Sequence, residues 1–168
     1  GTGSNATVKH GLSTAPKMII FKNRNTSTDW DVYHGSLANT ERLHLNTTGA
    51  KNTAAHAFNS TSPTTAVFSV GNADNTNKSS SPMIAYCFAE KQGYSKFGSY
   101  TGNGNADGSY VHLGFQPAFL IVKPIDAADN WVMFDNKRLG FNSSTSPYNF
   151  YANTNGPETT DTGQLDFV

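Results

Sequence analysis

The sequence predicts an all-β fold, a β-sandwich of the jelly-roll or concanavalin-like kind that is built from an internal duplication. The prediction rests on short runs of β-branched and aromatic residues, on polar connections rich in Asn, Ser, Thr and Gly, and on similarity between the two parts of the chain. Asn and Gly tolerate the left-handed conformations of turns, whereas Val, Ile, Phe and Tyr suit a pleated surface. No long segment has a helical period, and NTAAHAF at 52–58 predicts one helical turn at most.

Composition limits the classes of function. The chain has 168 residues, of which 14% are charged, and its formal net charge is zero. It therefore lacks the positive surface of a protein that follows nucleic-acid phosphates. No apolar stretch approaches the roughly 18–20 residues of a membrane span, and no signal peptide is visible. Cys87 is the single cysteine, so no disulfide forms within one chain.

The repeat appears when residues 1–30 are aligned with residues 102–131. We divide the chain into a first repeat, 1–101, and a second, truncated repeat, 102–168, packed as one globular unit. After Tyr33 the segment ERLHLNTT, 41–48, realigns with KRLGFNSS, 137–144, which predicts a loop of variable length in GSLANTE. The identical pairs of the first alignment are Gly1/Gly102, Gly3/Gly104, Leu12/Leu113, Pro16/Pro117, Ile20/Ile121, Lys22/Lys123 and Trp30/Trp131.

Each copy predicts the same elements in the same order. A short segment, 8–12 or 110–113, precedes a proline and an apolar strand, 17–22 or 118–123. The runs MIIF and FLIV are apolar at successive positions, which predicts central strands that are covered on both faces. A polar turn returns each strand to WDVYH or WVMFD, which predicts a hairpin whose tryptophan lies in the core. Further strands are predicted at 43–46, 66–70, 83–90, 94–100 and 164–168.

A family resemblance adds to this reading. The string YCFAEKQGYSKFGSYTGNGNADGSYVHLGFQPAFLIVK, together with APKMIIFKNRN and DWDVYH, resembles a repeated β module of large structural and tail-fibre-like proteins of marine phages. The resemblance spans residues 8 to about 138. It implies a non-enzymatic virion component, virion or extracellular in location, that attaches to a host surface. The chain begins inside its own repeat motif, so we expect a segment of something longer or completion by a neighbouring chain.

Exposed aromatics are the candidate ligand contacts. Sugar rings stack on aromatic faces while nearby polar side chains bind their hydroxyl groups. This logic keeps a second function open, a carbohydrate-binding, lectin-like module of a secreted or surface protein. The candidate residues lie among polar neighbours and are Tyr94, Tyr100, Tyr110, Tyr148 and Tyr151.

Metal binding and catalysis have weaker signals. Asp126 and Asp129 in DAADN supply the oxygen atoms that calcium prefers, but without the spacing of a known calcium loop. No cofactor is expected apart from calcium at these two aspartates. The five histidines have no metal-binding spacing and are interpreted as structural. No nucleophile elbow or carboxylate pair stands out, which favours a non-enzymatic role.

The expected partners follow from the fibre interpretation. Fibres gain stability through symmetric association, so we expect a homo-oligomer, of which a trimer is one form. Other virion proteins and a host glycan are the remaining expected partners, and nucleic acid is not one.

Overall fold

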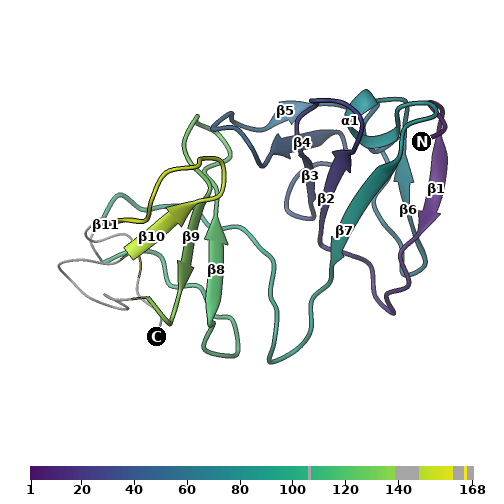
Figure 1. Cartoon of the computed structure of the whole chain (residues 1–168). Helices are drawn as coiled ribbons and strands as arrows, with labels where there is room; N and C mark the ends of the chain where they lie inside the picture. The colour runs from purple at the N-terminus through teal and green to yellow at the C-terminus, as the bar shows by residue number, and fades with distance from the viewer. Residues whose placement is uncertain (106, 139–147, 161–164, 166–168) are drawn as a thin grey trace.

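The computed structural model describes residues 1–105, 107–138, 148–160 and 165, and within these ranges it confirms the all-β prediction. The strands form three antiparallel sheets, with one short helix beside them (Figure 1). No helix in this part of the chain is long and apolar enough to cross a membrane. The elements are β1 Ala6–Lys9, β2 Met18–Asn23, β3 Asp31–His34, β4 Glu41–His44, β5 Asn52–Thr53, β6 Val67–Val70, α1 Asp74–Asn77, β7 Met83–Phe88, β8 Phe119–Val122, β9 Val132–Asp135, β10 Tyr148–Tyr151 and β11 Thr159–Thr160.

The first sheet has the strand order β5-β4-β3-β2-β7 and forms one layer of a sandwich-like unit. Ile19 and Phe21 of β2 point into its core, where the Phe21 ring lies 5.4 Å from the ring of Phe68 on β6. Phe58 completes the cluster at 5.5 Å from Phe21. Met18 on the opposite face of β2 is also buried. The prediction that MIIF is a central strand covered on both sides is therefore confirmed.

The second sheet has the order β11-β10-β9-β8 and follows the plan of β5-β4-β3-β2. Met18 pairs with His34 in the first hairpin, and Phe119 pairs with Asp135 in the second, so both hairpins keep an offset of 101 residues. The backbone N–H of each hairpin tryptophan also donates to an asparagine side chain, Trp30 to Asn46 and Trp131 to Asn153. The shared register supports the predicted duplication.

The later part of the predicted alignment is wrong. Val132, the counterpart of Asp31, pairs with Tyr151, whereas Asp31 pairs with His44. The counterpart of Asn46 is therefore Asn153, an offset of 107, and not Asn142, which lies outside the described residues. The extra length lies in the second copy between β9 and β10, not in GSLANTE. Local identity in KRLGFNSS misled the alignment, because strand pairing rather than sequence similarity sets the register.

One predicted strand is absent, and a second forms but is not covered as predicted. Residues 94–100 form no strand, since Lys91 and Ser95 make only an isolated bridge in a turn. Residues 110–113 form none either, although 8–12 overlaps β1. The run FLIV forms β8 at the end of the described strand order, where Phe119 is 58% exposed, so it is not a central covered strand.

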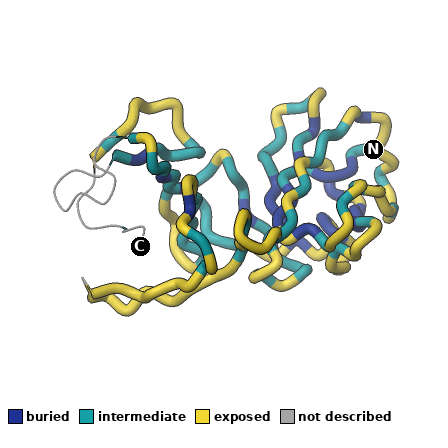
Figure 2. Tube along the Cα trace, turned by 90° about the horizontal axis from the view of Figure 1, so that it is seen from below, coloured by how far each residue is buried: buried dark blue, intermediate teal, exposed yellow. Residues whose placement is uncertain are grey.

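Two further predictions concern short segments. Residues 52–58 begin with β5 and continue as turns, so the predicted helical turn is absent there, and α1 follows later in the chain. Of the predicted strand at 164–168 only Leu165 is described, and it belongs to no strand. Figure 2 shows that the buried residues gather in the N-terminal unit, which contains the first sheet, while the unit of the second sheet is more exposed.

Close packing in the first unit gives a testable consequence at Gly71. A Cβ atom there would lie 2.0 Å from the backbone oxygen of His56, so Gly71→Ala forces the backbone apart. We expect a loss of about 1–3 kcal/mol in the free energy of unfolding, measured by urea denaturation with circular dichroism. Gly98→Ala is the matched control, because its Cβ would meet nothing within 4 Å. Equal stability of the two variants would contradict the packing.

Candidate functional site

The two sheets meet at Trp131, which precedes β9 and is only 4% exposed. Its indole packs on Met18, Val32 and Leu43 of the first sheet. The indole N–H donates a hydrogen bond of 2.9 Å to the backbone oxygen of His44. The prediction that Trp131 lies in a core is confirmed, and this core is shared between the two units.

The turn after β8 extends this contact. The backbone N–H of Asp129 donates to the oxygen of Thr48 at 2.9 Å, and the Lys51 N–H donates to Ile125 at 2.9 Å. The Nζ atom of Lys123 also lies 3.3 Å from the Thr48 oxygen. Burial lowers the pKa of Lys123, and the carboxylate of Asp129 offsets part of that effect. The second hairpin is thus fixed to the first unit at its turn as well as at its tryptophan.

The two aspartates predicted as calcium ligands lie in this turn. Asp126 is highly exposed, and its Oδ1 atom lies 3.5 Å from Nζ of Lys51. Asp129 receives the N–H of Asn130 on its side chain. Across the described ranges, no three His, Cys, Asp or Glu side chains are close enough to hold a metal ion. The role that the structure gives this turn is contact between the units.

Trp30 has the same position in the first hairpin but a different environment. It is partly exposed, stacks on Tyr86 at a centroid distance of 6.5 Å, and has Nζ of Lys22 at 5.6 Å from its ring. Tyr86 is 43% exposed, and so is Phe88, which lies two residues farther along β7 and away from Trp30. The prediction of a core position is wrong for Trp30, because the neighbouring sheet that buries Trp131 has no counterpart over Trp30 among the described residues.

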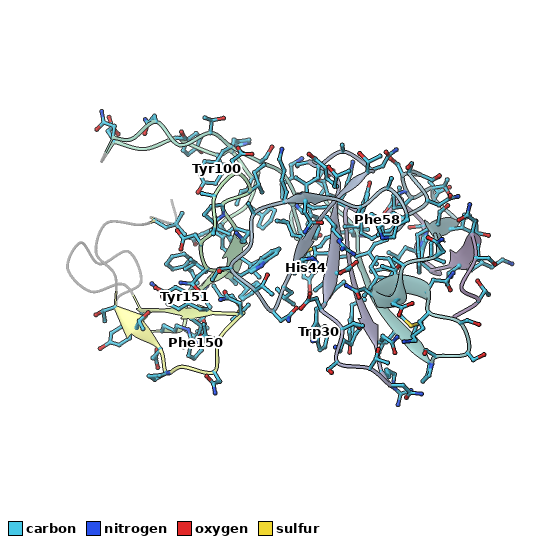
Figure 3. The ribbon with its side chains drawn as sticks, turned by 90° about the horizontal axis from the view of Figure 1, so that it is seen from above. Trp30, His44, Phe58, Tyr100, Phe150 and Tyr151 are labelled. Atoms are coloured by element: carbon cyan, nitrogen blue, oxygen red, sulfur yellow. The ribbon has the colours of Figure 1, made fainter. Side chains whose placement is uncertain are left out.

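The five candidate tyrosines do not form one site. Tyr94, Tyr100 and Tyr110 are exposed on the long segment between β7 and β8, with Tyr94 at 80%. Tyr148 and Tyr151 are half-buried on β10. Figure 3 shows Tyr100 on the connecting segment, well apart from Tyr151 and Phe150 on β10.

Tyr148 borders a hollow of about 530 Å³ that it shares with Asp135, Lys137, Arg138 and Glu158. Arg138 organises this hollow, with Nε 2.7 Å from Asp135, Nη1 3.1 Å from Glu158, and its guanidinium over the Phe150 ring. Partial desolvation opposes ionisation of Asp135, but hydrogen bonds from the Lys137 and Arg138 backbones and the Arg138 charge lower its pKa overall. The hollow therefore presents an aromatic ring next to fixed charges of both signs.

A buried charge network that the sequence analysis missed lies beneath the first sheet. The Asp31 carboxylate is fully buried and accepts from Nη1 of Arg42 at 2.6 Å and from the Asn75 amide at 2.7 Å. Nδ1 of His44 lies 3.1 Å from Asp31, while the Asn52 amide nitrogen faces Nε2 of the same ring at 3.2 Å. The sequence signal for this network was available in WDVYH. Successive side chains of a strand point to opposite faces, so Asp31 shares the face of the buried Tyr33.

The pKa of Asp31 is lowered in spite of its burial. Desolvation alone would raise it, but contacts with His44, Asn75 and Arg42 stabilise the ionised form by more. The counterparts of Asp31, Arg42 and His44 in the second sheet are Val132, Asn149 and Tyr151. The network therefore belongs to the first unit alone, where it joins β3 and β4 to α1.

Comparison with known proteins places the chain in a family. Residues 1–168, the whole chain, match the family model described as "Domain of unknown function (DUF7483)". The chain belongs to this family. No curated protein and no solved structure matches the chain significantly.

Acid should weaken the first unit through Asp31. A carboxyl group whose pKa is lowered by folding adds stability above its unfolded pKa, near 3.9, and that stability is lost as the pH falls through the folded value. We expect Asp31→Asn to lose about 3–5 kcal/mol at pH 7, because Arg42 is left without its buried partner. When the pH is lowered from 7 to below 4, the free energy of unfolding should also fall less in the variant than in the wild type.

Urea denaturation at a series of pH values measures both effects. Asp107→Asn changes an exposed carboxylate and is the control. A parallel pH dependence in wild type and Asp31→Asn would contradict the assignment.

The two tryptophans should differ in their contribution to stability. Trp131→Ala removes a buried ring from the contact between the sheets and should cost about 3–5 kcal/mol. Trp30→Ala removes a partly exposed ring in the equivalent position and should cost clearly less. Denaturant unfolding followed by circular dichroism compares them, and equal losses would show that the contact at Trp131 is not a core.

Proposed function

We propose that the chain is a non-enzymatic structural module of a virion, of the fibre-like kind, that acts outside the host cell and takes part in host attachment. The observation that carries this proposal is the contact at Trp131, in which one sheet unit uses a large aromatic side chain to dock on the face of the next. A module that stacks in this way suits a structural repeat. The sequence resemblance to marine-phage structural proteins supports the virion setting.

Self-association and contact with other virion proteins are part of this proposal. The partly exposed ring of Trp30 stacks on the exposed Tyr86, and Phe88 is exposed two residues farther along β7, which supports it because exposed apolar patches commonly mark interaction sites. We expect a homo-oligomer, of which a trimer is one form.

A second candidate is recognition of a carbohydrate at the hollow beside β10. Tyr148 offers a ring for stacking, while Asp135, Lys137, Arg138 and Glu158 offer donors and acceptors for hydroxyl groups. This arrangement favours a lectin-like role for the second unit. It is compatible with host attachment by a fibre module and also with a free-standing carbohydrate-binding module.

Solution size and glycan binding separate the two candidates. For the structural module we expect sedimentation velocity to show concentration-dependent association of the 18.1 kDa chain, with no glycan binding needed for it. A monomer that binds an oligosaccharide on a glycan array, and loses it in Tyr148→Ala, would favour the lectin. Polysaccharide hydrolysis abolished by one carboxylate substitution would contradict the non-enzymatic assignment.

A further inference from the structure

The contact that buries Trp131 has a counterpart in the second sheet, on which no tryptophan packs within the described part of the chain. The residues that receive Trp131 are Met18, Val32 and Leu43, and all three are buried. Their counterparts, by the shared strand register, are Phe119, Met133 and Phe150. We call these three the acceptor surface. All are large and apolar, yet Phe119 is 58% exposed and the other two are only half-buried, with the Arg138 guanidinium 3.6 Å from the Phe150 ring centroid at the edge of the surface.

The polar part of the contact is repeated too. The His44 oxygen accepts from the Thr47 N–H at 3.4 Å and also from the Trp131 indole. The Tyr151 oxygen accepts from the Thr154 N–H at 3.3 Å in the same kind of turn. The Thr154 hydroxyl also lies 3.5 Å from the Tyr151 oxygen, a long contact that a docking indole N–H replaces.

The first unit carries the matching donor surface, Lys22, Arg24 and Trp30. Lys22 and Trp30 are the counterparts of Lys123 and Trp131, which make the contact between the sheets. The Lys22 ammonium donates to the Thr28 backbone beside Trp30, as Lys123 donates to Pro124 in its own turn. The exposed Tyr86 and Phe88 extend this donor surface with apolar area.

The charges at the two ends also complement each other. In the existing contact Lys51, on the receiving side, faces Asp126. The counterpart of Lys51 is Glu158, since β11 pairs with β10 in the register of β5 and β4. The exposed Arg24 lies next to the counterpart of Asp126. The signs are reversed on both sides, so attraction is preserved.

We propose that the donor surface of one copy of this chain docks on the acceptor surface of a second copy, head to tail, in the geometry that already joins the two sheets. This inference deepens the proposed self-association and rests on it. Trp30 enters between Phe119, Met133 and Phe150 of the partner subunit, and its indole N–H donates to Tyr151 of the partner subunit. Two different surfaces meet, so the contact is heterologous. A docked pair therefore still has one donor surface and one acceptor surface open, and further copies can add at either. Figure 3 shows Trp30 on the first unit and Phe150 on the second, so one chain carries both surfaces.

Two variants, one for each end, test the proposal. Trp30→Ala removes the docking ring, and Phe119→Arg places a charge on the acceptor surface at an exposed position that should not disturb the fold. Each variant alone should weaken self-association at least about 30-fold in sedimentation velocity, the loss typical of a central aromatic. Mixed in equal amounts, they should form a 1:1 dimer that grows no further, because each variant keeps one intact surface.

Trp30→Phe and Tyr94→Ala are the controls. Trp30→Phe keeps an aromatic ring without the N–H and should retain part of the association. Tyr94→Ala removes an exposed aromatic outside both surfaces and should change nothing. Circular dichroism checks the fold of each variant.

Three outcomes would overturn the inference. If Trp30→Ala associates like the wild type, the docking is wrong while the proposed structural function stands. If the two variants do not complement one another, the contact is not head to tail. If the wild type stays monomeric, the docking fails; if that monomer also binds an oligosaccharide and loses it in Tyr148→Ala, the structural function fails too, in favour of the lectin.

Discussion

Burial of Trp131 on the first sheet is the interaction on which the arrangement of the two units depends. A tryptophan in such a contact removes about 150–250 Å² from water, and at about 25 cal/mol per Å² this is roughly 4–6 kcal/mol as an upper value. Without it, Met18, Val32 and Leu43 would leave an apolar face open to water. The hydrogen bond from the indole to the His44 oxygen fixes the ring at one place on that face. The same ring thus covers one sheet and positions the other.

The two hairpins share one strand register but carry different residues on their faces. This difference explains why they make different contacts. Both hairpins pair at the same positions and bind their tryptophan N–H to an asparagine side chain. The first sheet needs charge compensation beneath β3, where Asp31, Arg42 and Asn75 join the strands to α1. The second sheet has Val132 in place of Asp31 and carries its charges at Arg138 instead. The strand pairing is a property of the backbone and survives such exchanges, whereas each face adapts to whatever covers it.

The surfaces that remain open agree with a role in association. Aromatic residues gather beside Trp30 at one end and on β8 and β10 at the other, while the hollow at Arg138 combines an aromatic ring with charges. Such surfaces bind by shape and apolar area and need no reacting group. The two candidate functions differ only in whether a protein or a carbohydrate fills them. Membership of the DUF7483 family joins the chain to other proteins that share this domain, so the same surfaces can be sought there.

The sequence by itself determined the fold class, the β2–β3 and β8–β9 hairpins and the equivalence of their tryptophans, because these depend on local apolar runs, on turn residues and on identities at a constant offset of 101 residues. It did not determine β10 and β11, since a similar string at 137–144 competed with the true counterpart of β4 and only cross-strand pairing separates them. Nor did it find the Asp31 network, whose members come from β3, β4 and α1. The different burial of Trp30 and Trp131 was decided by tertiary structure alone. Exposure depends on what the rest of the chain places over a residue, and the similar local sequences of the two hairpins carry no information about that.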